Sequence, residues 1–140
     1  MIRHNRRAGN ALFEFAASLV LLSTMFAGIF QAGYTFFTYS TLVNAVRAGA
    51  RYASLNPLAG SSSEEFSNAV RNIVVYGDSV PAPDASAIVN GLTTDKVVVS
   101  IDQGLATVSL RDFAIDAAFL KIKLDGRPTV TFPISTGAAE

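Results

Sequence analysis

The sequence contains no cysteine and only one histidine, and this composition restricts the catalytic and metal-binding chemistry available to the chain. Without cysteine, disulfide frameworks, cysteine-based zinc sites and thiol catalysis are excluded. The single histidine, His4, lies in a basic N-terminal leader, so a serine nucleophile elsewhere has no imidazole base. We therefore expect no catalytic residues and no enzymatic activity.

No charge of either sign is in excess, since eleven basic and eleven acidic residues give a formal net charge of zero. Nucleic-acid-binding proteins usually carry a basic patch, so no nucleic-acid partner is expected. The aspartates are scattered through the second half of the chain without the spacing of a calcium-binding EF-hand loop. We therefore predict no metal and no cofactor.

The first part of the chain lacks proline and almost lacks charge. No proline precedes Pro57, and Glu14 is the only charged residue between Ala8 and Ala45. As a helix, the apolar stretch 11–33 is about 34 Å long, which matches the roughly 30 Å hydrocarbon core of a bilayer. This length favours a membrane-spanning helix. A buried soluble helix, or a secretory signal with its usual apolar region of about 7–15 residues, fits less well.

Basic residues lie on one side of this span. Arg3, Arg6 and Arg7 precede it, and the next basic residue is Arg47. The positive-inside rule therefore places the N-terminus in the cytoplasm and the chain after about Tyr34 outside the membrane. Three aromatic residues follow the span and suit either an aromatic belt or packing within a domain. They are Phe36, Phe37 and Tyr39.

The helical pattern continues beyond the span, so we expect one helix from about residue 10 to 55. Asn56-Pro57 ends it, because proline disfavours a helical conformation at the preceding residue. The half of the helix that follows the span carries small residues that let another element pack close to its backbone. These are Ala45, Ala48, Gly49 and Ala53.

The second half predicts a small α+β arrangement. A helix is expected at 63–76, with Ser62 and Glu65 at the spacing of a capping box and Gly77 as its stop. The proline-containing stretch 77–95 predicts a loop.

Three strands of an antiparallel sheet are expected within residues 96–135. Residues 96–101 and 105–110 flank Asp102-Gln103-Gly104 and predict a hairpin, and 129–135 predicts a third strand at a sheet edge because of Pro133. Residues 113–124 fit either a short helix or an irregular return. The fold class is therefore α+β, with a long N-terminal helix, a second helix and about three strands.

One motif stands out, and it opens the apolar stretch. In RRAGNALFEF (6–15), arginines and Gly9 precede four uncharged residues, then Glu14 and Phe15, then the span. This resembles the class III signal of type IV pilins. The resemblance implies that a prepilin peptidase cuts after Gly9, that Asn10 becomes the new N-terminus, and that Glu14 and Phe15 act in assembly.

A second segment narrows the resemblance. NAVRAGARYAS (44–54) is similar to the corresponding segment of the TadE-like family, the minor pilins or pseudopilins of tight-adherence (Tad, Flp-type) pili. The resemblance covers 6–54 and implies a type IV pilin-like fold. Its partners would be the prepilin peptidase, other pilin subunits and the pilus assembly platform in the membrane. Asn10 departs from the phenylalanine that many type IV pilins have at this position.

The charges at the cut site have a physical rationale. After cleavage, Asn10 would carry an ammonium group that Glu14 of a neighbouring subunit can neutralise, so two groups that are each costly in an apolar bundle compensate each other. A slipped subunit would leave both unpaired, so the pair also sets the axial register. Small residues would let the helices approach closely. They are Ala16, Ala17, Ala27, Gly28, Ala32 and Gly33.

These observations predict a TadE-like minor pilin in three parts: a cytoplasmic leader (1–9), a transmembrane and filament-core helix (10–33), and an extracytoplasmic domain (34–140). The precursor would lie in the bacterial cytoplasmic membrane, and the processed protein in the periplasm or in an extracellular filament. Two alternatives stay open. The chain could be the principal subunit of a fibre, or an uncleaved single-pass protein that presents a binding domain.

Overall fold

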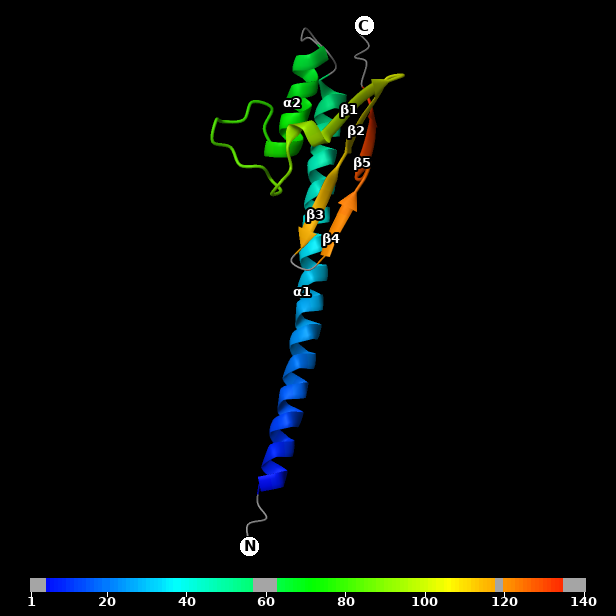
Figure 1. Ribbon diagram of the computed structural model, residues 1–140. Helices are drawn as coiled ribbons and strands as arrows, with labels where there is room; N and C mark the ends of the chain where they lie inside the picture. Colours follow the sequence, from blue (N-terminus) through cyan, green and yellow to red (C-terminus); the bar gives the residue numbers. More distant parts are fainter. Residues whose placement is uncertain (1–4, 57–62, 118–119, 135–140) are drawn as a thin grey trace.

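A computed structural model describes residues 5–56, 63–117 and 120–134, and it confirms the α+β fold class with a long N-terminal helix. Helix α1 covers Asn5–Leu55, so it is about 77 Å long. Its first half, up to about residue 33, projects from the domain and is called the stalk below. Its second half forms one wall of a small domain (Figure 1). Because the helix is continuous across residues 9 and 33, the expected division at these positions stays a prediction.

Helix α2 (Ser63–Tyr76) packs against the second half of α1. Its buried residues Phe66, Val70, Val74 and Val75 recur at helical spacing and form one apolar face. Two glutamates in its first turn suit the positive end of the helix dipole. The helix ends at Gly77, whose φ of 81° favours glycine. Ser62, the first residue of the expected capping box, lies outside the described residues.

Between α2 and the sheet the chain is irregular except for a short 3-10 helix, η1 (Thr94–Lys96). The Ile88 amide of this segment donates a hydrogen bond of 2.8 Å to the Val75 carbonyl of α2. Val89 and Leu92 bury their side chains in the core. The loop therefore covers one end of α2 while its remaining side chains stay largely accessible.

Three antiparallel strands form the main sheet in the order β1-β2-β5. They are β1 (Val97–Asp102), β2 (Leu105–Leu110) and β5 (Thr129–Pro133). The β1–β2 connection is a two-residue turn, in which Gln103 and Gly104 both have positive φ, as a type I′ turn requires. The expected hairpin and the edge position of the third strand are both confirmed.

Residues 113–124 do not form the short helix or the irregular return that their sequence suggests. They form a second antiparallel pair, β3 (Phe113–Ala117) and β4 (Leu120–Leu124). In β3 every second residue is buried, so a period of two applies where the apolar residues also allowed a helical reading. The hairpin lies along α1 beside the main sheet (Figure 1), and this packing decides its conformation.

The core lies between the second half of α1, α2 and the strands. Leu42, Val46 and Ala50 of α1 are fully buried together with Val108 and Leu110 of β2. The expectation of close packing at small residues of α1 holds at three of the four positions. Ala45, Gly49 and Ala53 are buried, whereas Ala48 is exposed.

Two side chains of α1 hydrogen-bond to the strands at the two ends of the domain. Gln31 donates through Nε2 to the Ala117 carbonyl at 2.6 Å, and Ser54 donates through Oγ to the Pro133 carbonyl at 2.6 Å. Residues 31 and 54 lie about 35 Å apart along the helix. The domain is therefore attached to α1 at both ends of this length, and Ala117 at the end of β3 lies at the end nearest the stalk.

Candidate functional site

The expected cut site lies within α1, where the chain is regular helix. Asn10 donates through Nδ2 to Glu14 Oε1 at 3.2 Å, and both side chains are exposed. The two residues are four apart, so they lie on one face of the helix. In the chain with its leader, the backbone nitrogen of Asn10 is a peptide nitrogen. The side-chain amide is therefore the group that pairs with Glu14 before any cleavage.

Large apolar side chains cover the stalk on all sides. Phe15 is 69% exposed, Phe26 71% and Phe30 63%. A helix that is apolar all round requires lipid or other helices around it. Within the described residues, one helix (Gly9–Leu55) is long and apolar enough to cross a membrane. The stalk is thus the membrane-anchoring part of the chain.

The small residues expected to mediate helix packing lie on this exposed helix. A Cβ atom added at Gly28 or Gly33 would meet no described atom within 4 Å. Ala16 and Ala17 line a shallow groove together with Phe13 and Val20. Nothing in the described part of this chain packs closely on these positions, so they are available to a second helix. Ala32 contributes to another groove, beside the β3–β4 hairpin.

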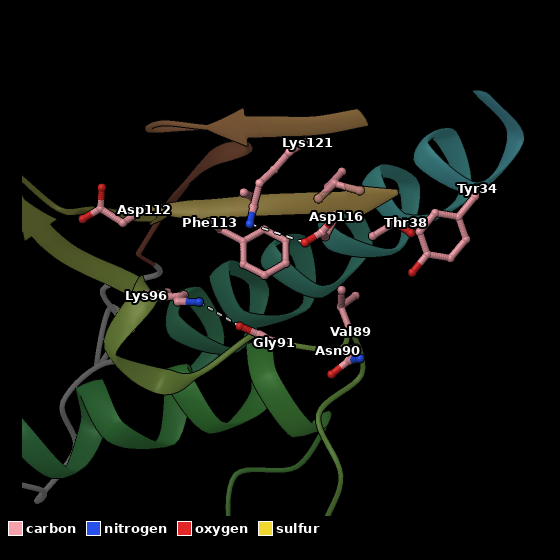
Figure 2. Close-up of a pocket in the computed structure, with 12 residues that line it drawn as sticks. Tyr34, Thr38, Val89, Asn90, Gly91, Lys96, Asp112, Phe113, Asp116 and Lys121 are labelled. Carbon is pink, nitrogen blue, oxygen red and sulfur yellow. Dashed lines mark hydrogen bonds and ion pairs between the residues drawn. The ribbon is translucent and has the colours of Figure 1, made fainter. Parts of the chain in front are cut away.

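A polar pocket of about 430 Å³ lies between α1, the loop before η1 and the β3–β4 hairpin. Lys96 crosses it, donating to the Gly91 carbonyl at 2.9 Å, with its Nζ 5.4 Å from the centre of the Phe113 ring. Lys121 and Asp116 form an ion pair of 3.4 Å at its rim (Figure 2). The pocket therefore offers two ammonium groups beside carboxylates, with the aromatic rings of Phe113 and Tyr34 in its lining.

No local pattern in the sequence indicates this pocket, because one of its walls is the β3–β4 hairpin, which the sequence does not predict. Thr38 and Tyr34 belong to α1, whereas Asp112 and Phe113 lie at the start of the hairpin.

Near the pocket, hydrogen bonding from the Thr93 side chain and from the Asp95 backbone lowers the pKa of the Asp95 carboxyl, and Lys96 lowers it further. In the described part of the chain, no three histidine, cysteine, aspartate or glutamate residues gather as a metal site would require.

An apolar helix that continues into a small α+β domain is the architecture of a membrane-anchored protein. The family model described as TadE-like protein matches residues 9–51, from the expected cut site to the middle of the domain wall. The resemblance inferred from the sequence is thereby confirmed, and it associates the chain with Tad pili. The family is structural rather than enzymatic. No curated protein and no solved structure gives a match.

Proposed function

We propose that this protein is a minor pilin, or pseudopilin, of a Tad pilus. It is made as a membrane-anchored precursor with its N-terminus in the cytoplasm, and prepilin peptidase cleaves it after Gly9. It is then assembled with other pilins into the pilus or at its base, through the stalk of α1. In the assembled bundle, the amine of Asn10 pairs with Glu14 of a neighbouring subunit.

The observation that carries this proposal is the coincidence of the family match with the charge pattern of the stalk. The match begins at Gly9, and Glu14 is the only charged residue of the stalk beyond it. A lone carboxylate within an apolar helix is costly and marks a functional position by default. A cationic amine created beside it by cleavage gives that carboxylate a partner of opposite charge.

The cleavage step is tested with Gly9→Ala. A Cβ atom at this position would meet no described atom within 4 Å, so the substitution leaves the fold unchanged and alters only recognition by the peptidase. We expect the variant to accumulate at the precursor mass in cells that contain the assembly system. Mass spectrometry and N-terminal sequencing of membrane preparations give the readout.

Gly33→Ala is the matched control, because it makes the same chemical change at an equally open position of the same helix. It should be processed as the wild type is, with Asn10 as the first residue. Processing of Gly9→Ala to the wild-type mass would refute cleavage after Gly9. An intact Met1 in the wild-type protein would favour the uncleaved binding protein instead.

A minor subunit and a principal fibre subunit differ in abundance. Mass spectrometry of sheared fibres should therefore find this chain as a small fraction of the pilin present. If the dominant component of the fibres begins at Asn10 of this chain, the protein builds the fibre itself.

A further inference from the structure

The β3–β4 hairpin ends beside the stalk at the level where a bilayer around the stalk would end. Counted from Ala11, the roughly 30 Å hydrocarbon core takes up about 20 helical residues, which places its far boundary next to Gln31. Gln31 is the residue whose side chain holds the Ala117 carbonyl at the end of β3. With α1 as the span, the end of β3 at Ala117 would therefore lie at the boundary between hydrocarbon and headgroups.

The side chains of β4 suit this position. Leu120 is 53% exposed at the stalk-proximal end of the strand, and Ile122 and Leu124 alternate with it on the face toward α1. Lys121 and Lys123 lie on the opposite face and are both exposed. An apolar side chain at the boundary, followed by two long basic side chains, is the pattern of a segment that contacts a lipid interface.

The space between the hairpin and α1 is also apolar. A groove of about 640 Å³ is lined by Gly28 and Ala32 of the stalk and by Leu120 and Ile122 of the hairpin. Gly28 lies about 4 Å further into the span than Gln31. The groove thus continues the apolar surface of the span up to the hairpin.

Charge complementarity identifies the lipid groups that the hairpin meets. Lys121 pairs with Asp116 at 3.4 Å, but both side chains are largely exposed, with 63% and 74% of their surfaces accessible. Figure 2 shows this pair at the rim of the polar pocket. Exposed pairs of this kind are weak, so a lipid phosphate would be able to replace Asp116 as the partner of the ammonium group. Counting Lys121, Lys123 and Asp116, the end of the hairpin carries an excess of one positive charge.

We propose that the β3–β4 hairpin rests on the bilayer surface beside the span, with Leu120 at the interface and Lys121 and Lys123 against lipid phosphates. The domain is then held upright on the membrane by two supports, the span and the hairpin. The proposal rests on α1 being the membrane span of the proposed precursor. It does not depend on cleavage or on assembly.

Because the natural sequence has no tryptophan, each single tryptophan variant reports on one position. The full chain is reconstituted into vesicles of phosphatidylcholine and phosphatidylglycerol with brominated acyl chains, which quench an indole only when it lies close to them. Leu120→Trp probes the hairpin, and Phe26→Trp probes a position of the span within the hydrocarbon core. Ile101→Trp is the control in β1, near the end of the domain that Ser54 holds.

We expect the indole of Leu120→Trp to be quenched by at least about half as much as that of Phe26→Trp, with a blue-shifted emission. The indole of Ile101→Trp should be unaffected by bromine. If Leu120→Trp behaves like Ile101→Trp while Phe26→Trp is quenched, the hairpin contact is wrong and the span stands. If Phe26→Trp is also unquenched, the span and this proposal both fail.

The phosphate contact has its own test in the Leu120→Trp background. Phosphatidylglycerol should raise the quenching, and Lys121→Gln with Lys123→Gln should abolish that rise, since each lysine near an anionic surface favours contact about fivefold. Arg47→Gln with Arg51→Gln removes the same charge from exposed positions on the distal half of α1 and should leave the rise intact. A rise that survives the lysine substitutions would refute the contact with phosphate.

Discussion

Glu14 and Asn10 are the residues on which the proposed assembly depends. In the chain with its leader, the Asn10 amide donates to the Glu14 carboxylate at 3.2 Å. This bond needs no cleavage, so the precursor already partly satisfies its lone carboxylate. An ammonium group is a stronger partner, because hydrogen bonds between charged groups are about twice as strong as neutral ones. Cleavage would therefore favour exchange of the side-chain amide for the amine of a neighbour.

Glu14→Gln separates the charge from the shape of this side chain. The glutamine oxygen still accepts from Asn10, so we expect normal insertion and normal cleavage. Assembly should fall at least about tenfold, because an unpaired ammonium in an apolar bundle costs several kcal/mol. Mass spectrometry of membrane fractions and immunoblots of sheared filaments measure the two steps.

Glu14→Asp is the matched control, since it keeps the charge and shortens the side chain. It should assemble better than Glu14→Gln. Equal incorporation of Glu14→Gln and wild type into filaments would contradict the role of the charge pair.

The contact between α1 and α2 depends on one missing side chain. A Cβ atom at Gly49 would overlap the Cγ2 methyl of Val74 and lie 3.4 Å from the Val70 carbonyl oxygen. Val74 is fully buried and its branched side chain has few alternative rotamers. Glycine normally weakens a helix by about 1 kcal/mol relative to alanine, so its presence here reflects the close approach of the two helices.

Gly49→Ala should therefore lower the free energy of unfolding by about 1–3 kcal/mol, despite the better helix propensity of alanine. Thermal unfolding of the full chain in detergent, followed by circular dichroism, measures the change. Adding Val74→Ala removes the overlapping methyl group, so the double variant should lose less than the sum of the two single variants. Strict additivity would show that the two positions do not interact.

The two hairpins show what the sequence can and cannot predict at the scale of elements. The β1–β2 pair was predictable because its turn, Gln103-Gly104, is a local signal that lies between two runs of β-branched residues. The β3–β4 pair has no such signal within its described residues, and its apolar residues fit either period. Packing on α1 decides its conformation, and such long-range contacts are not visible in a local pattern.

The candidate sites also differ in whether a local sequence pattern indicates them. The expected cut site and Glu14 lie on one helix within six residues of each other, so a short local motif is enough for the resemblance to predict them. The contact from Gln31 to Ala117 joins residues 86 positions apart, and the polar pocket brings Tyr34 together with Lys121. They depend on the conformation of the β3–β4 hairpin, so the sequence could not reveal them.

At the scale of the whole molecule, the two halves of α1 require different surroundings. Every described buried core residue lies at Thr38 or beyond, and the stalk before Gly28 contributes none. The domain therefore needs only the second half of α1 for its core. The stalk needs an apolar environment that the chain itself does not supply.

A fragment that begins at Ile29 tests this separation, since it keeps the hydrogen bond of Gln31 and removes most of the span. We expect it to be soluble without detergent and to unfold cooperatively, with the helix and strand signals of the intact domain. Size-exclusion chromatography and circular dichroism provide the measurement. A fragment that aggregates or lacks a thermal transition would show that the domain depends on the removed residues.

The hydrogen bonds from Gln31 and Ser54 have a mechanical consequence. A subunit pulled along the axis of α1 experiences shear between the helix and the domain, because the two are joined side by side over about 35 Å. Under shear, the contacts along this length bear tension together, whereas under peeling they would break in sequence. The arrangement therefore suits a component that must stay folded while the helix is drawn out of one environment and held under load in another.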